Sequence, residues 1–369
     1  MSEVEYSNSK AIWHTDKIKS LQQGKPIIPT EIQVDLEAFC NHNCKFCSYR
    51  KDDGYNNEML KLINGKPSKE NKPIGQPSID SRIPDNIVLD IPRQMVEAGI
   101  PAIEITGGGE SFLHPKITEF IKLLGEADRE IGIVTNGSLF NDERIMLIKK
   151  YATWIRISMD SSNPITHKLI HNTGGNDFDR IISYIKQLLD GKRKDLILGI
   201  SFIITPENYD DVENSARLYA SLKVNHIRFS WMYDKEGHAG LSSEQIDKVV
   251  ILIKSLQIEL DTDEFHIFNE SNRIQLYTAR NDFKTCHYQR FVMAIGADSG
   301  VYPCCIMKYN TKFQYANLKN NTLKEIVESL NTKSFMDNLN PTFCNPCWLA
   351  DRNKSIDKAV TPPTHRNFI

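Results

Sequence analysis

The chain has 369 residues, a formal net charge of −2 and 25% charged residues, a composition typical of a globular protein with room for one large and one smaller domain. The near-neutral charge excludes a basic field that would draw the protein to nucleic acid or to an anionic membrane. The polar start, MSEVEYSNSK, and the lack of an uninterrupted apolar stretch of membrane-spanning length favour a cytoplasmic protein.

From about residue 31, short apolar runs alternate with longer amphipathic ones. The apolar runs have the near-continuous character of strands that are buried on both faces, and they are 31–37, 102–106, 131–135, 154–160, 196–204 and 226–233. The amphipathic runs that follow them predict helices over 84–99, 117–127, 142–151, 178–191, 210–223 and 243–256. Such repeats indicate parallel strands joined by right-handed crossovers. Since six repeats are fewer than the eight of a closed barrel, we expect an α/β fold, a partial (β/α)6 TIM barrel with its site at the carboxyl ends of the strands.

The remaining segments divide the chain further. Residues 1–30 form an N-terminal extension to a barrel over 31–260, and the polar insertion 51–83 has the composition of either a mobile lid or a disordered segment. Turn-rich sequence follows over 261–350. The tail 351–369 is polar, and we expect it to be docked or frayed.

Cysteines fall in two groups. They are Cys40, Cys44 and Cys47, followed by Cys286, Cys304, Cys305, Cys344 and Cys347. In a cytoplasmic chain of this size, clustered cysteines indicate metal or redox chemistry rather than a disulfide framework. The first group lies in the loop FCNHNCKFCSYR (39–50), directly after the first predicted strand. Three thiolates around a four-iron cube would leave one iron open, as a catalytic metal requires; a structural zinc site with His42 as the fourth ligand is the alternative.

Polar residues also end the next three predicted strands. TGGGE (106–110) follows the second strand, TNG (135–137) the third, and SMD (158–160) the fourth. Adjacent glycines allow close approach to backbone groups, and Glu110 offers a carboxylate for an ammonium group. Each element taken alone could be an ordinary turn, but together they face the cysteine loop.

At these residues the sequence resembles the radical S-adenosylmethionine (SAM) enzymes. The CxxxCxxC loop, with the aromatic Phe46 before its last cysteine, is the signature of that superfamily, and the Gly-Gly-Glu element agrees with it over roughly residues 31–235. The resemblance implies a 4Fe-4S cluster on Cys40, Cys44 and Cys47, with its open iron bound by the methionine part of SAM. It implies SAM contacts from Gly107, Gly108, Gly109, Glu110, Asn136, Ser158, Phe46 and Ile203. One electron from the cluster would cleave SAM, and the resulting 5′-deoxyadenosyl radical would remove a hydrogen atom from the substrate.

The second cysteine group has the thiolates that a closed metal site requires. Residues 286–305 predict a hairpin with a turn at 297–300, which would bring Cys286 near Cys304, and FCNPCW adds the pair Cys344 and Cys347. Four thiolates suit either zinc or an iron-sulfur cluster. The arrangement resembles the twitch or SPASM-like domain of some radical SAM enzymes, which implies one auxiliary 4Fe-4S cluster over these four cysteines. The spacing is closest to that of 2-deoxy-scyllo-inosamine dehydrogenase, with Asp298-Ser299-Gly300 in place of the usual Asp-Gly turn.

Three reactions fit this resemblance. In the first, a small polar substrate such as a sugar or aminocyclitol is dehydrogenated, with the auxiliary cluster as electron acceptor. In the second, the spare Cys305 returns a hydrogen atom and the enzyme is an epimerase; alternatively Cys305 is only a small buried residue. In the third, a ribosomal peptide is modified, which the short segment before the first strand disfavours. A non-catalytic iron-sulfur electron carrier is the alternative of another class.

The expected partners are a small-molecule substrate and a reductant protein such as flavodoxin or ferredoxin, with no nucleic acid and no membrane. Substrate contacts are the least defined part of the site. Candidates from the strand ends are His114, Arg156, Asp160, Arg228, Trp231 and Tyr233.

Overall fold

The computed structural model describes residues 9–47, 82–173, 176–232, 239–270, 283–344, 347 and 349–361. Its strands form one sheet in the order β10-β9-β8-β1-β2-β3-β4-β5-β6-β7. They are β1 (Glu31–Asp35), β2 (Ala102–Thr106), β3 (Glu130–Thr135), β4 (Ala152–Ser158), β5 (Ile197–Ile204), β6 (His226–Trp231), β7 (His266–Asn269), β8 (Val292–Ile295), β9 (Gly300–Tyr302) and β10 (Ala316–Asn317). All pairs from β8 through β1 to β7 are parallel, whereas β9 and β10 run antiparallel to their neighbours.

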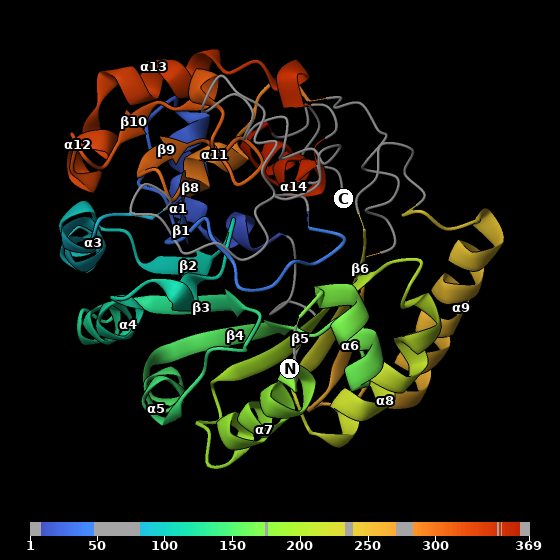
Figure 1. The fold of residues 1–369 in the computed structure, drawn as a ribbon. Coiled ribbons are helices and arrows are strands. Elements are labelled where there is room, and N and C mark those ends of the chain that lie inside the picture. Colours follow the sequence, from blue (N-terminus) through green and yellow to red (C-terminus); the bar gives the residue numbers. More distant parts are fainter. Residues whose placement is uncertain are drawn as a thin grey trace.

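The helices are α1 (Thr15–Gln22), α3 (Asp85–Ala98), α4 (Ile117–Glu126), α5 (Asp142–Tyr151), α6 (Pro164–His171), α7 (Asp177–Leu189), α8 (Val212–Ser221), α9 (Ser243–Leu260), α11 (Tyr288–Phe291), α12 (Leu323–Glu328), α13 (Leu330–Asn338) and α14 (Ala350–Val360). Of these, α3, α4, α5, α7, α8 and α9 lie along the outer side of the curved sheet (Figure 1). The sheet begins at β10 and ends at β7 without closing. This confirms the predicted partial barrel. None of the helices in the described ranges is long and apolar enough to cross a membrane.

The structure differs from the sequence prediction both in added elements and in strand ends; β1, for example, ends at Asp35 rather than at residue 37. A seventh parallel strand, β7, pairs with β6 beyond the point where the repeat was expected to end. Helix α6 lies between β4 and α7, where no helix was predicted. Strand β4 ends at Ser158 rather than at residue 160, because Asp160 adopts a left-handed backbone conformation with φ +53°. Residues 51–81 of the insertion and Tyr233 lie outside the described residues.

Local sequence signals explain where the helices begin and end. Ser242 and Gln245 form a capping box at the start of α9. Asn163 caps α6, with Pro164 in the first turn, where its missing N–H is not needed. Gly99 ends α3 at φ +72°, a conformation that glycine adopts without strain. The caps at Asn163 and Ser242 end the connections after β4 and β6, which lie at the carboxyl ends of those strands.

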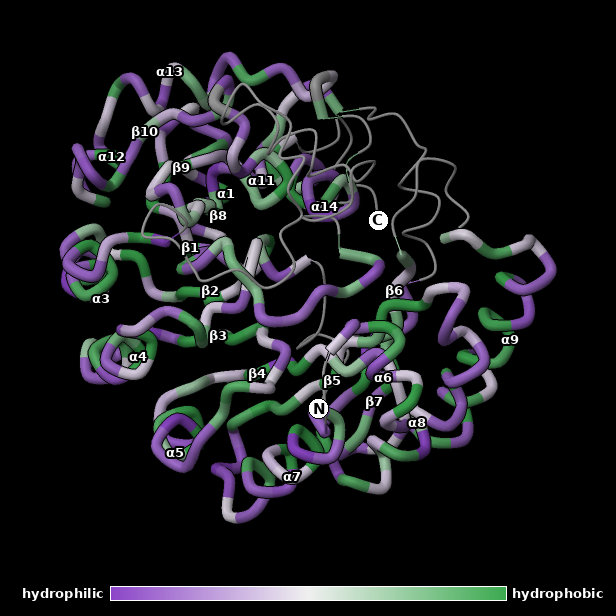
Figure 2. The backbone as a smooth tube through the Cα atoms, in the orientation of Figure 1, coloured by the Kyte–Doolittle hydropathy of each residue, from purple (hydrophilic) through white to green (hydrophobic). Residues whose placement is uncertain are grey.

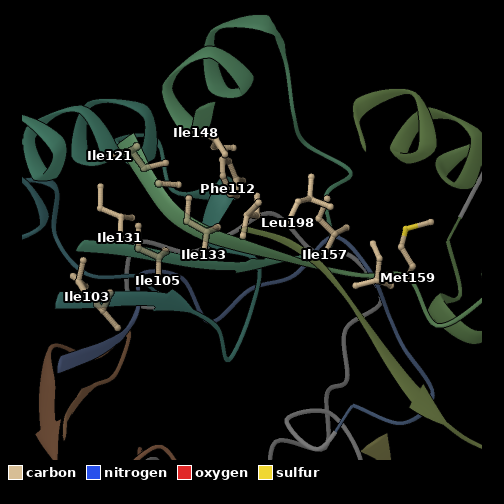
Figure 3. Packing of buried hydrophobic residues seen from close by; sticks show 14 of the residues in the cluster. Ile103, Ile105, Phe112, Ile121, Ile131, Ile133, Ile148, Ile157, Met159 and Leu198 are labelled. Atoms are coloured by element: carbon tan, nitrogen blue, oxygen red, sulfur yellow. The ribbon is translucent and has the colours of Figure 1, made fainter. Parts of the chain in front are cut away.

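The main core lies between the sheet and the helices. Figure 2 shows hydrophobic segments running through the strands, with hydrophilic residues recurring along the surrounding helices. Figure 3 shows Ile131 and Ile133 of β3 near Ile121 of α4 and Ile148 of α5, and all four side chains are fully buried. Burying one such side chain contributes about 1.5–3 kcal/mol. This layer holds the strands rigidly, so the loops at their ends start from fixed points.

A second, smaller core lies around the C-terminal cysteines. It contains Ile18 of α1, Phe291 of α11, Met307, Leu349 and Ile356 of α14. The Gln22 amide donates to the Ala359 carbonyl at 2.9 Å, so α1 and α14 are joined directly. The first part of the expected C-terminal tail is therefore a docked helix. The predicted hairpin is also confirmed as β8 and β9.

Candidate active site

The loop with the first three cysteines follows β1 and is clamped from two sides. On one side, the Asn43 and Lys45 amides donate to the carbonyls of His171 and Ile170 at the end of α6, at 3.0 and 3.1 Å. On the other side, the Glu110 amide donates to the Phe39 carbonyl at 2.8 Å. The backbone around Cys44 and the backbone before Cys40 are therefore both held by neighbouring βα segments.

The glycines after β2 pack against this loop. A Cβ atom on Gly109 would lie 2.1 Å from the Phe39 carbonyl oxygen, and one on Gly107 would lie 2.1 Å from the Gly109 carbonyl oxygen. Gly108 lies between them in the same turn. The sequence suggested that these glycines admit a ligand; in the structure, close packing of backbone on backbone already requires glycine at both positions. Their predicted contact with SAM stays a prediction.

Glu110 is 2% exposed and its carboxylate accepts three hydrogen bonds. The Thr135 hydroxyl and the Phe112 amide donate to Oε1 at 2.8 and 3.0 Å, and the Asn136 amide donates to Oε2 at 2.8 Å. Burial nevertheless raises the pKa of this carboxyl group. Since a carboxylate oxygen can accept two bonds, Oε2 keeps one free acceptor position for the ammonium group that the sequence assigns to it.

Asn136, at the end of β3, connects that strand to the cysteine loop. Its side-chain Nδ2 donates to Asn41 Oδ1 at 2.9 Å and lies 3.8 Å from Cys40 Sγ. Its Oδ1 accepts from the amide and the hydroxyl of Ser138. The side chain is thus oriented toward Cys40, at the site where the sequence predicts a SAM contact.

Cys44 lies against two buried histidines. Cys44 Sγ is 3.1 Å from His171 Nδ1, and His42 Nε2 is 3.5 Å from Asp177 Oδ2. Burial opposes ionisation of the Cys44 thiol, but His171 and His42 outweigh it and lower its pKa to about 6. A thiol that ionises this readily is suited to bind iron, because the thiolate is the metal ligand.

The structure bears on the alternative of a zinc ion at the first cysteine group. Of the residues that the structure describes, His42, Cys44 and His171 are the group compact enough to share one metal ion. That group contains neither Cys40 nor Cys47, so the three cysteines of the loop are spaced too widely for a single shared ion. Three separated thiolates on one loop fit the corners of a larger iron-sulfur cube.

The other predicted SAM contacts end neighbouring strands. Ser158 ends β4 and is paired with Ser201 of β5. The Ile203 amide donates to Asp160 Oδ1, and the Phe46 ring lies 6.2 Å from the His171 ring. Ser158 and Ile203 therefore lie at the carboxyl ends of β4 and β5, and Phe46 reaches the end of α6 from the cysteine loop; their contact with SAM stays a prediction.

Among the described residues, the candidate substrate contacts are either buried or half-buried. His114 is fully buried, with Nε2 2.8 Å from the Ile83 carbonyl, and Trp231 is 1% exposed in the core. Both side chains are buried in this structure, and their contact with substrate stays a prediction. Arg228 lies 3.5 Å from Glu270, and Arg156 lies over the Trp154 ring. Both arginines are half-buried.

The C-terminal cysteines line one cavity. Cys286, Cys304, Cys344 and Cys347 surround an apolar space of about 430 Å³, part of which is open to solvent. Zinc held by four cysteines would keep their sulfurs about 3.8 Å apart, but these four do not form a group that compact. Desolvation raises the pKa of Cys344 and of Cys347 to about 12, and neighbouring thiols add to it. Four thiols that line one cavity fit an inserted metal cluster, which would stabilise their ionised form.

Cys305 lies apart from that cavity. Burial raises the pKa of its thiol, and the charges of Lys308, Glu104 and Arg352 also act on it. Its predicted role as a spare thiol stays a prediction.

Sequence reasoning missed the residues that support the cysteine loop. His171 was not selected, although the spacing of His167 and His171 places both on one face of a short helix. Asp35 and Lys308 were also missed; they form a buried ion pair. A lone Asp and a lone Lys carry no motif, so no pattern in the sequence could have paired them.

The chain is similar to known protein families and to several other proteins. The Radical SAM superfamily model matches residues 37–219, and the model of the SPASM iron-sulfur cluster-binding domain matches residues 286–348. The S-adenosylmethionine-dependent nucleotide dehydratase of Flammeovirga pacifica is 31% identical over 200 residues, 53% of this chain and 60% of that protein. A probable GTP 3′,8-cyclase of Saccharolobus islandicus is 26% identical over 205 residues, 55% of this chain and 56% of that protein.

Among solved structures, Streptococcus suis SuiB bound to the precursor peptide SuiA has a TM-score of 0.62 at 14% identity, covering 93% of this chain and 74% of SuiB. This likeness concerns the fold. The matches to the curated relatives span about 60% or less of their length. Together, the two family models confirm the expected cofactors, SAM and 4Fe-4S clusters.

Proposed function

We propose that this chain, which belongs to the radical SAM superfamily and carries a SPASM iron-sulfur domain, dehydrogenates a small polar substrate such as a sugar or an aminocyclitol. When bound, SAM and its cluster supply hydrogen-atom abstraction, and the auxiliary cluster supplies an acceptor for the second electron. An alcohol carbon that loses a hydrogen atom, an electron and the hydroxyl proton becomes a carbonyl carbon. The overall change is therefore a two-electron oxidation.

The chain's own residues would hold and orient these groups. Cys40, Cys44 and Cys47 would hold the SAM cluster, with the loop fixed by its backbone bonds to α6 and to the turn after β2. Glu110 would accept from the SAM ammonium through the free acceptor position on Oε2. Asn136, held by Asn41, would meet the ribose or the carboxylate.

The remaining predicted contacts follow the same pattern. Gly107, Gly108, Gly109, Ser158, Phe46 and Ile203 would line the rest of SAM, and Cys286, Cys304, Cys344 and Cys347 would hold the auxiliary cluster. A flavodoxin or ferredoxin would supply the first electron.

One observation supports the oxidation most. Strand β8, at the start of the auxiliary domain, is hydrogen-bonded in parallel to β1, with Glu31 opposite Val292 and Val34 opposite Ile295. Strand β1 leads into the three-cysteine loop, and β9 leads into Cys304. The two cysteine sites are thus attached to one continuous sheet, in which β8 separates β1 from β9, and this shared scaffold supports electron transfer from a substrate at the first site to an acceptor at the second.

The test is anaerobic turnover with reconstituted protein. Candidate sugars, aminocyclitols, nucleotides and peptides are incubated with SAM and dithionite, and 5′-deoxyadenosine and product masses are measured. We expect substrate-dependent 5′-deoxyadenosine and a product lighter by two hydrogen atoms. Cys344→Ala/Cys347→Ala should still cleave SAM but form little oxidised product. A modified peptide, or no mass loss with any substrate, would contradict the proposal.

A second candidate rests on Cys305. Because its thiol does not line the four-cysteine cavity, Cys305 would return a hydrogen atom to the substrate radical. The resulting thiyl radical would take one electron from the reductant and one proton, and the product would be an epimer of unchanged mass. Turnover in D2O discriminates the two reactions, since an epimerase would introduce one deuterium at the inverted carbon. Cys305→Ser would abolish epimerisation while keeping both clusters.

A further inference from the structure

We propose that His171, held by Asp160, is a positioning residue that donates a hydrogen bond to the Cys44 sulfur and so sets the reduction potential of the SAM cluster. This inference rests on the part of the proposed function that assigns Cys44 to that cluster. It concerns one residue just after β4 and one on α6, neither of which belongs to the CxxxCxxC motif. It also gives a role to helix α6, which ends directly at the loop.

The end of α6 is built to receive the cysteine loop. The carbonyls of Ile170 and His171 accept from the amides on either side of Cys44, at 3.1 and 3.0 Å. Asn172 then turns the chain away in a left-handed conformation, φ +47°. The last carbonyls of a helix have no partner within the helix, so the loop satisfies them. This fixes Cys44 relative to the side chain of His171.

The His171 ring is surrounded by acceptors. Nδ1 lies 3.1 Å from Cys44 Sγ, and Nε2 lies 3.2 Å from Asp160 Oδ2 and 3.0 Å from the Met159 carbonyl. A cluster-bound cysteine is a thiolate and can only accept. Both ring nitrogens therefore face groups that can accept hydrogen bonds, and Nδ1 lies where it can donate to the Cys44 sulfur.

Asp160 is itself fixed in place. It is fully buried, its Oδ1 accepts from the Ile203 amide, and its carbonyl accepts from the Asn208 amide nitrogen at 2.9 Å. Its left-handed backbone, φ +53°, directs the side chain toward α6 rather than along the strand. The order Asp160–His171–Cys44 is thus an anchored chain of polar contacts inside the protein, where such bonds are least weakened by water.

The distances favour a direct hydrogen bond over a shared metal ion. One tetrahedral zinc ion on Cys44 and His171 would separate Sγ and Nδ1 by about 3.6 Å. The observed 3.1 Å is shorter. A donor beside a cluster sulfur stabilises the reduced state, since reduction adds negative charge to the sulfurs, and hydrogen bonds to sulfur are one determinant of cluster potential.

The experiment compares three variants of the full chain, reconstituted anaerobically, by EPR-monitored redox titration. His171→Ala removes the donor, whereas His171→Asn returns an N–H near the position of Nδ1. His167→Ala is the matched control, because His167 is 1% exposed on the same helix, packs on His171 and has its Nδ1 near Ser161 and Met159 rather than near Cys44. The Cys40/Cys44/Cys47→Ala variant gives the spectrum of the auxiliary cluster alone.

We expect His171→Ala to shift the SAM-cluster potential to more negative values and to change its EPR spectrum. Iron should also be lost to a chelator about 10-fold faster or more. His171→Asn should restore most of the potential, and His167→Ala should match wild type. An unchanged potential in His171→Ala, or an equal shift in His167→Ala, would overturn the inference. The titration uses no substrate, so it tests the hydrogen bond even if the proposed oxidation is wrong. If Cys44 does not bind the SAM cluster, the wild-type protein should show only the EPR signal of the auxiliary cluster.

Discussion

Lys308 and Asp35 form an ion pair in which neither side chain is more than 1% exposed. The Tyr309 hydroxyl donates to the second carboxylate oxygen of Asp35 at 2.8 Å. Asp35 is the last residue of β1, directly before the cysteine loop, and Lys308 follows Cys304 and Cys305. The pair therefore fixes the segment after the auxiliary cysteines to the strand that carries the first cysteine group.

We expect Lys308→Met to destabilise the protein by about 3–5 kcal/mol, because it leaves the Asp35 carboxylate buried without its cation. The double variant Asp35→Asn/Lys308→Met should recover much of the lost free energy of unfolding, because no buried charge is then left unpaired. Urea unfolding followed by circular dichroism measures both. Lys333→Met is the control: its pair with Asp337 has both side chains about 40% exposed, so it should cost at most about 1 kcal/mol. Equal effects of the two lysine variants would contradict the prediction.

Gly109→Ala should displace the cysteine loop. The new Cβ would lie 2.1 Å from the Phe39 carbonyl oxygen, which is backbone and cannot rotate away. We expect iron bound by the first cysteine group to fall at least several-fold, with 5′-deoxyadenosine formation falling in parallel. Iron and sulfide analysis after reconstitution measures this.

The control for this variant is Gly191→Ala. Gly191 has φ +59° and no heavy atom within 4 Å of its added Cβ. Alanine there should cost about 1–2 kcal/mol of backbone strain without changing the iron content. Normal iron in Gly109→Ala would show that the packing of this glycine is not needed to shape the cluster loop.

The barrel could be predicted because its strands are long apolar runs separated by amphipathic helices. Helix α6 and strand β7 could not, although Asn163 and Pro164 are good helix-start signals. Eight residues in α6 and four in β7 are too short for periodicity to separate them from loops.

The site was predictable only where the chain folds on itself locally. Cys40, Cys44 and Cys47 lie within one loop, so their spacing reveals them. The His171 contact with Cys44 joins residues 127 positions apart, and the Lys308 contact with Asp35 spans 273 positions. Such contacts depend on the register of strands and on helix placement, which the spacing of residues does not encode.

Glu31 makes the stability of the protein dependent on pH. Burial and the nearby Glu104 raise the pKa of its carboxyl from 4.5 to about 8, although Gln33 donates to both glutamates. The folded state therefore binds a proton that the unfolded chain has lost, and stability falls as pH rises from about 4.5 to about 8.

We accordingly expect Glu31→Gln to be as stable as wild type near pH 5 and more stable at pH 8, by an amount on the order of a few kcal/mol. Urea unfolding at both pH values measures the difference. Glu130→Gln, on the first residue of β3 and exposed, should behave like wild type at both. A wild type that gains stability toward pH 8 relative to Glu31→Gln would reverse the sign of this prediction.

Cys304 and Cys305 are adjacent in the chain but have different surroundings. Cys304 lines the cavity with Cys286, Cys344 and Cys347, whereas Cys305 does not. Both cysteines follow β9 where the chain bends into a turn, in which the Met307 amide donates to the Cys304 carbonyl at 3.2 Å. The two substitutions should therefore separate cluster assembly from any role in catalysis.

We expect Cys304→Ala to lose most of the auxiliary cluster, so that iron falls from two cubes to about one, and the thermal midpoint falls with it because metal binding and folding are coupled. Cys305→Ala should keep both cubes and the wild-type midpoint. Iron, sulfide and Mössbauer analysis of the two proteins measures this. Equal iron loss in both would mean that Cys305 is a cluster ligand, and both the epimerase candidate and the four-cysteine assignment would then be wrong.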